Sequence, residues 1–386
     1  MLTKLTNVAL PYAWGSTHLI SDHFGIAATG EPMAEIWFGT HAGSPTATES
    51  GESLASIIGS ARLPFLLKIL AAAKPLSIQA HPNAEQAQAG FAVENALGIP
   101  LDAGHRNYKD SLAKPELIVA LSSGFEALAG FKTPADIAQM FEAIALESGN
   151  ATLSALLGDF KTQVLTIDDG SGSGLERVFL ATLTDERLSA GVLEEFVAAA
   201  AKVDAIAPLV AVLSANNAGD RGIVSALMMN HLELKRGQAI FVPAGMPHAY
   251  LSGLGVEVML ASDNVLRGGL TPKHIDIAEL QKVLIFEPSV PKVQGGRTLA
   301  QGLDQFDLEI SEFAFYRISP TAANLLADAN LPGESIALCT SGQVAISTSL
   351  GERIVLAKGE AAYISGDART FSVAGVGEIF MAVSTI

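Results

Sequence analysis

Hydrophobic and polar positions change their period along the chain. Through the first 130 or so residues, short apolar runs of strand length stand between turns rich in glycine and proline. Phe65–Leu70 and Leu117–Leu121 are two such runs. This part of the chain therefore predicts short strands joined by loops.

At Thr133 the period becomes that of an α-helix. Thr133 supplies an N-cap, Pro134 the first helical position and Asp136 an acid in the first turn. Apolar residues then recur at helical spacing, namely Ile137, Met140, Phe141, Ile144 and Ala145. Thr184–Glu186 predicts the start of another helix, and Ala-rich segments continue beyond it. We therefore expect a helical block over roughly residues 132–221.

Strand and turn character returns near Gly222 and lasts to Ile386. Short apolar segments separated by turn residues fill the last part of the chain, namely Ser335–Leu338, Gln343–Ile346, Arg353–Leu356, Ala361–Ile364 and Ile379–Val383. The order is strands, a helical block, strands again, and a second β unit. The fold class that this order predicts is mainly β with a helical insert.

Composition narrows the class of protein. Hydrophobic residues make up 49% and charged residues 17%, which excludes a disordered chain. No apolar run reaches the roughly 18 residues that a membrane helix needs. The 24 Lys and Arg against 40 Asp and Glu give a net charge of -16, which argues against nucleic acid or an anionic membrane as partner.

The single cysteine, Cys339, cannot form an internal disulfide and excludes a zinc site built from cysteines. Residues 1–20 contain no long apolar segment of a secretion signal. We expect a cytoplasmic protein that is a monomer or a weak homo-oligomer.

Two early segments place polar side chains within strand-like sequence. Side chains alternate on a strand, so Ser77, Gln79 and His81 share one face. Lys114 and Glu116 lie two residues apart and also share a face, where burial of either without a partner would be costly. A surface strand with solvated polar residues explains each of these patterns equally well.

A third segment carries a more specific signal. Gly237–His248 fits Gly-x5-Pro-x-Gly-x2-His, the second signature of cupins, which are small jelly-roll barrels. Pro243 and Gly245 turn the chain back, so that His248 points into the barrel with Tyr250 on the same face. An isolated histidine is more often a core residue, but this setting predicts that His248 is a metal ligand.

The fourth segment supplies further charges. Glu257 lies between apolar neighbours in a strand, and Asp263 follows shortly after it. Arg267 and Lys273 flank a glycine-rich loop, an arrangement suited to a phosphate, although a solvated loop explains it too. Together the four segments offer nitrogen and oxygen donors that suit Zn²⁺ without a thiolate.

The segments closely resemble the type I mannose-6-phosphate isomerases, also called phosphomannose isomerases. The resemblance extends over residues 10–275 or so and rests on Tyr12–Ser16, Ala34–His41, Ser77–Pro82, Lys114–Glu116, Pro243–Leu251 and Ser262–Lys273. It implies an enzyme that interconverts mannose 6-phosphate and fructose 6-phosphate through an enediol or enediolate.

The resemblance also implies an architecture and a set of roles. We expect a catalytic cupin in residues 1–131 and 222–275, a helical domain in 132–221, and a C-terminal jelly roll without metal in 276–386. By resemblance, one zinc ion per chain is held by Gln79, His81, Glu116 and His248. The expected catalytic residues are Arg267, Lys114 and Glu257, and the expected substrate-binding residues are Ser77, Lys273, Tyr250 and Asp263.

Two departures from the family pattern and several alternatives remain. The segment Glu35–Gly39 carries isoleucine and phenylalanine where leucine and methionine are commoner in the family, a volume-conserving change. Many family members carry a histidine where this chain has Ala113. The remaining histidines are expected to be structural or superficial, namely His18, His23, His41, His105, His231 and His274. A cupin with different metal chemistry, such as an iron oxygenase, and a non-catalytic sugar-binding cupin are the alternative functions.

Overall fold

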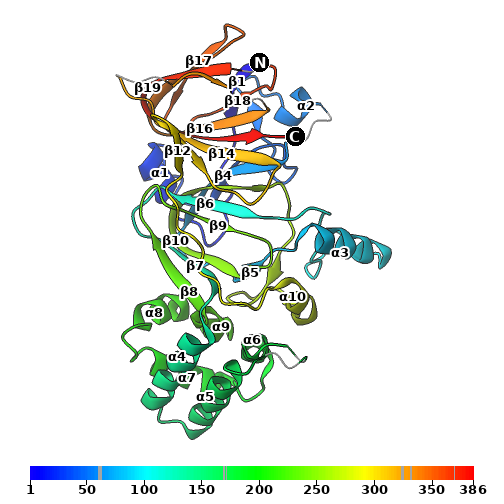
Figure 1. Ribbon diagram of the computed structural model, residues 1–386, viewed down its shortest axis with the longest axis vertical. Coiled ribbons are helices and arrows are strands. Elements are labelled where there is room, and N and C mark those ends of the chain that lie inside the picture. Colours follow the sequence, from blue (N-terminus) through cyan, green and yellow to red (C-terminus); the bar gives the residue numbers. More distant parts are fainter. Residues whose placement is uncertain (60–62, 168–169, 171, 323–325, 331–332, 369) are drawn as a thin grey trace.

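Backbone pairing sorts the strands into two antiparallel sheets. The structure is a computed structural model that describes residues 1–59, 63–167, 170, 172–322, 326–330, 333–368 and 370–386. Within these residues one sheet has nine strands and the other ten. Figure 1 shows the helices α4–α9 gathered at one end of the molecule and the sheet that contains the C-terminus at the other. The predicted fold class, mainly β with a helical insert, is confirmed.

The nine-stranded sheet is organised around one long strand, β10. Its members are β2 (Glu35–Phe38), β4 (Phe65–Ala72), β5 (Gln79–Ala80), β6 (Glu116–Ala120), β7 (Phe125–Phe131), β8 (Met229–Leu234), β9 (Ala239–Val242), β10 (His248–Leu260) and β11 (Leu266–Arg267). The register of β10 places His248 opposite Gln79 and Glu257 opposite Lys68. Because directly opposed residues of antiparallel strands share a face, this register brings together polar residues that are far apart in sequence.

The ten-stranded sheet contains both ends of the chain. Its members are β1 (Leu2–Thr6), β3 (Ala47–Thr48), β12 (Arg297–Ala300), β13 (Leu303–Phe306), β14 (Phe313–Ile318), β15 (Leu326–Asn330), β16 (Ser335–Thr348), β17 (Arg353–Ala357), β18 (Ala361–Ile364) and β19 (Thr370–Ser384). Strand β1 pairs with β18, so the N-terminal strand lies in this sheet and not in the nine-stranded sheet. The division into domains stays a prediction.

The helices cover the stretch where the helical period was found. They are α4 (Pro134–Glu147), α5 (Ala151–Val164), α6 (Gly174–Thr184), α7 (Ala190–Ala200), α8 (Ala207–Asn216) and α9 (Gly222–Leu227). The Thr133 side chain accepts a hydrogen bond from the Asp136 backbone N–H, as the N-cap prediction requires. The predicted helix start at Thr184–Glu186 is wrong, because α6 ends at Thr184 and the next helix begins only after Ser189.

Helix α3 (Ala84–Ala96) lies in a region that the sequence predicts as loops and short strands. The remaining helices are α1 (Leu19–Phe24), α2 (Leu54–Ile57) and α10 (Ile277–Val283). Helix α3 buries only Ala87 and Glu94 and therefore has no apolar stripe. Its sequence signal is the capping box, in which Asn83 and Gln86 cap each other's backbone N–H groups. In the described residues, no helix has the length and apolar character that crossing a membrane requires.

Candidate metal centre and substrate cleft

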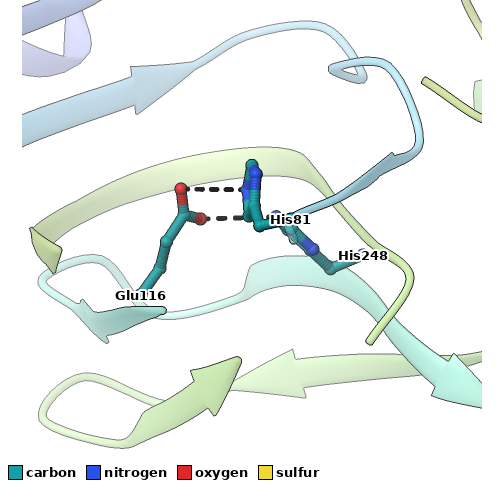
Figure 2. A group of neighbouring side chains, drawn as sticks. All are labelled: His81, Glu116 and His248. Carbon is teal, nitrogen blue, oxygen red and sulfur yellow. Dashed lines mark ion pairs between the residues drawn. The ribbon is translucent and has the colours of Figure 1, made fainter. Parts of the chain in front are cut away.

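Three side chains from separate strands converge in the nine-stranded sheet. His81 follows β5, Glu116 begins β6 and His248 begins β10, and all three are at most 3% exposed. His81 Nε2 lies 3.2 Å from Glu116 Oε1, and His248 Nε2 lies 3.3 Å from Glu116 Oε2. Figure 2 shows the Glu116 carboxylate directed toward the two imidazole rings. Within the described part of the chain, no other group of three His, Cys, Asp or Glu side chains has all its possible ligand atoms within 4.8 Å of one another.

Gln79 lies on the same side of the sheet as this group. It pairs with His248 on one neighbouring strand and with Arg267 on the other. Its side-chain Nε2 donates to Ser77 Oγ at 3.4 Å. The adjacent Ile78 and Ala80 are buried in the core that the helices form. The alternation expected for this segment therefore separates polar side chains at the site from apolar side chains in the core.

Lys114 provides the charge that faces the carboxylate. Its Nζ lies 2.6 Å from Glu116 Oε1 and 3.5 Å from His81 Nε2. Burial alone would raise the pKa of Glu116, but the Lys114 ammonium and then His81 lower that pKa well below its usual value. Burial, and then Lys114, lower the pKa of His81 to about 4. An ionised carboxylate beside a neutral imidazole is the protonation state that metal ligation requires.

Both imidazoles are oriented through their other ring nitrogen. His81 Nδ1 lies 2.7 Å from the Asn264 backbone carbonyl, and His248 Nδ1 lies 3.2 Å from the Met246 carbonyl. Each Nδ1 can donate to its carbonyl, which leaves Nε2 as the acceptor atom facing Glu116. The Asn264 side chain in turn donates to the Asp110 backbone carbonyl at 2.9 Å. No local sequence signal distinguishes Asn264 or Asp110 as residues that support the site.

Tyr250 indicates that the site takes a further group. Among the described residues its buried hydroxyl has no hydrogen-bond partner, although it borders a pocket of about 50 Å³ with Gln79, Glu116 and His248. Burial, followed by the charges of Glu257 and Glu116, raises the pKa of Tyr250. A buried hydroxyl without a partner is costly, so the pocket favours a ligand or water there. Imidazole nitrogens and a carboxylate that converge beside it fit a zinc ion.

A second buried charge group lies against this pocket. Lys68 Nζ is 3.0 Å from Glu257 Oε2 and 3.8 Å from Glu35 Oε1. Trp37 donates from Nε1 to Glu35 Oε2 at 2.8 Å, and its ring faces Lys68 Nζ at 5.0 Å. Burial raises the pKa of Glu257 even though Lys68 opposes the shift. The sequence analysis did not identify Lys68 as a site residue. The one sequence signal for it is that it is a charged residue within the apolar run Phe65–Ala72.

Three of the four predicted substrate residues, Ser77, Lys273 and Asp263, line clefts outside the metal pocket, whereas Tyr250 lines the metal pocket itself. One cleft of about 470 Å³ includes Ser77, Gln79, Arg267 and Lys273. Because Gln79 also borders the inner pocket, this cleft adjoins the candidate metal site. A second cleft of about 410 Å³ includes Arg267, Lys273 and Asp263. Asp263 Oδ2 is 3.2 Å from His41 Nε2, so its carboxylate is engaged in an ion pair.

The remaining histidines lie away from the metal pocket. His41 is buried against Trp37, with ring centroids 5.0 Å apart. His231 pairs with Glu126 at 2.8 Å, and His23 Nε2 lies 3.1 Å from the Thr340 carbonyl. His18 Nδ1 lies 3.3 Å from Ser16 Oγ. His105 and His274 are exposed and face each other, with ring centroids 6.5 Å apart.

Comparison with known proteins identifies the family. The model of the phosphomannose isomerase type I catalytic domain matches residues 2–134. The mannose-6-phosphate isomerase of Salmonella typhimurium is 34% identical over 408 residues, and that of Escherichia coli is 31% identical; each match covers 98% of both chains. A solved mannose 6-phosphate isomerase with zinc bound is 33% identical, covers both chains completely and has a TM-score of 0.85. The chain belongs to the type I phosphomannose isomerase family.

Family membership confirms the resemblance inferred from the sequence. It also confirms the predicted zinc cofactor at the level of the family, because a related structure holds zinc and this chain has a buried His–Glu–His group. Ala113, where many phosphomannose isomerases carry histidine, is half-buried against the core between the two sheets. This chain therefore has no imidazole at that position.

Proposed function

We propose that this protein is a zinc-dependent aldose–ketose isomerase that interconverts D-mannose 6-phosphate and D-fructose 6-phosphate. The observation that carries the proposal is the buried His81–Glu116–His248 group, whose pocket shares Gln79 with the cleft lined by Arg267 and Lys273. Metal-type donors and cationic side chains therefore line two adjacent pockets, as a reaction on a sugar phosphate requires.

The zinc ion is assigned to His81, Glu116 and His248, with Gln79 as the fourth ligand. Gln79 is supported by its register opposite His248 and by its place on the wall of the same pocket. When bound, zinc supplies Lewis acidity for the sugar oxygens. Lys114 contacts the same carboxylate oxygen as His81, so part of its role is to offset the charge of Glu116.

The isomerisation moves a proton between C1 and C2 through an enediol or enediolate. Lys114 and Glu257 both border the inner pocket and are the two groups that we assign to proton transfer. Glu257 has a raised pKa because it is buried, which brings this carboxyl group nearer to the pH at which a base is effective. Lys68 holds the Glu257 carboxylate in place at 3.0 Å.

The phosphate is assigned to the outer end of the cleft. Because the net charge is -16, long-range attraction does not draw a dianion to the protein, and local cations must bind it. Arg267 and Lys273 supply these cations, and Ser77 lies in the same cleft. We place Tyr250 on the inner side, toward the sugar carbonyl, and Asp263 beside Arg267 in the neighbouring cleft. In addition to phosphate binding, Arg267 is assigned to stabilising the developing enediolate charge.

A coupled assay with each of the two sugar phosphates tests the proposal. We expect turnover in both directions that stops after chelation and returns with zinc. Zinc binding without turnover would instead indicate a non-catalytic cupin, and oxygen uptake with iron would indicate a cupin oxygenase. The oligomeric state and the cytoplasmic location stay predictions.

A further inference from the structure

The loop that carries Arg267 and Lys273 has an unfavourable backbone conformation at one residue. Leu270 lies between Arg267 and Lys273 and has φ +55°, the only positive φ of a non-glycine residue in the described part of the chain. Its side chain is buried in the core that the helices form. A non-glycine residue keeps this conformation only where its surroundings impose it. Contacts on both sides of the loop therefore hold Leu270 in this conformation.

One side of the loop is held by backbone pairing with the strand β5 segment. Ile78 N donates to the Gly269 carbonyl at 3.0 Å, and Gly268 N donates to the Ile78 carbonyl at 2.9 Å. These bonds end at Gly269, immediately before the strained residue. They do not reach Thr271, which begins the second half of the loop.

The other side is held by a turn of the helical insert. Asp220, between α8 and α9, accepts the Thr271 backbone N–H at Oδ2 and the Gly222 backbone N–H at Oδ1, both at 2.7 Å. Gly222 packs directly on the loop, since a Cβ atom there would lie 2.3 Å from Leu270 N and 2.6 Å from Gly269 Cα. One carboxylate thus joins the insert to the cation loop where the two backbones are closest.

The same turn also borders the substrate cleft. Asn217 lines that cleft together with Ser77, Arg267 and Lys273. Arg267 and Lys273 line the same cleft, and burial, followed by repulsion from Arg267, lowers the pKa of Lys273. A rigid loop lowers the cost of keeping two like charges in one cleft before an anion binds. Asp220 can provide this rigidity because its carboxylate binds the loop backbone at Thr271.

We propose that Asp220 is a positioning residue of the substrate site, which latches the Arg267–Lys273 loop to the helical insert and so preorganises the cleft for a phosphate group. The proposal rests on the proposed function for the identity of the substrate. The proposal gives the helical insert a role in substrate binding, in addition to its role in covering the sheet.

The test compares Asp220→Ala with Asp185→Ala. Asp185 also lies in the insert and accepts the backbone N–H of the residue two positions later, at 2.9 Å, but it does not contact the loop. Binding of inorganic phosphate and of mannose 6-phosphate is measured by calorimetry, so the result does not depend on turnover. We expect Asp220→Ala to weaken both by about tenfold or more, as expected for a lost bond to a charged group. Asp185→Ala should match the wild type.

Kinetics and two further variants distinguish a specific effect of Asp220 on the loop from a general loss of stability. Asp220→Ala should raise KM more than it lowers kcat and should leave zinc content unchanged, because its bond is at Thr271, on the Lys273 side of the loop. Asp220→Asn, which keeps one acceptor oxygen, should fall between wild type and Asp220→Ala. Gly222→Ala should weaken phosphate binding without removing the carboxylate, because its Cβ displaces the loop. Unchanged phosphate affinity in Asp220→Ala, with or without a lower melting temperature, would overturn the proposal. A wild-type protein that binds the sugar phosphate without turning it over would contradict the proposed function and leave the latch standing.

Discussion

Lys68→Met removes the one cation that lies between two buried carboxylates. Lys68 Nζ is 3.0 Å from Glu257 and 3.8 Å from Glu35, and the three side chains are 7%, 3% and 9% exposed. Loss of one partner from a buried ion pair costs about 3–5 kcal/mol because the remaining charge is uncompensated. For 386 residues at about 2.1 cal/mol/K of unfolding entropy per residue, each kcal/mol shifts the melting temperature by about 1.2 °C, so it should fall by roughly 4–6 °C.

The pH dependence and a double variant identify the cause. Burial raises the pKa of Glu257 and Lys68 opposes that rise, so the variant should have a still higher Glu257 pKa. A raised folded-state pKa means that stability is present at low pH and is lost as pH rises. The deficit of Lys68→Met should therefore shrink as pH falls from about 7 to 5. Adding Glu257→Gln should recover part of the loss, because it removes one unpaired charge.

Thermal unfolding of the chelated protein, followed by circular dichroism, is the assay. Lys4→Met is the matched control, since Lys4 Nζ pairs with Glu360 at 2.9 Å but the two side chains are 24% and 41% exposed. It should cost less than about 1 kcal/mol. A shift in Lys68→Met no larger than in Lys4→Met, or a double variant less stable than the single one, would refute the reasoning.

Four further outcomes are expected. His248→Ala should lose most of its zinc in elemental analysis, and full retention would remove His248 from the ligand set. Lys273→Ala should raise KM much more than it lowers kcat, whereas an unchanged KM would exclude a phosphate contact. Arg267→Ala should lower kcat by on the order of 100-fold with zinc intact, since one preorganised charge donor is lost; near wild-type turnover would contradict this role. In chelated protein, the His81 pKa of about 4 lies below the usual value of about 6.5, so the free energy of unfolding should be highest above pH 6.5 and should fall by up to about 3 kcal/mol toward pH 4. His81→Gln should reduce this dependence of the melting temperature on pH.

The parts of the site that follow from sequence are those with a local signal. The glycine and proline spacing before His248 fixes a turn and a return strand, and the alternation through Gln79 and His81 fixes which side chains share a face. Both signals act within a few residues. They are therefore visible before any long-range pairing is known.

The parts that were missed depend on long-range pairing. Lys68 becomes a site residue only because β10 places Glu257 opposite it, and Asn264 matters only because its carbonyl reaches His81 across the sheet. Likewise, nothing local in β1 indicates that it pairs with β18, more than 350 residues away. Helix α3 was missed because small and polar residues give it no apolar stripe.

A titration of zinc into the chelated protein tests the central claim most directly. Bound zinc and the rate of conversion of mannose 6-phosphate to fructose 6-phosphate are measured in the same samples. We predict negligible turnover without metal and a linear rise that ends at one zinc per chain. Turnover that persists after complete removal of the metal, or one bound zinc per chain without turnover, would contradict the account.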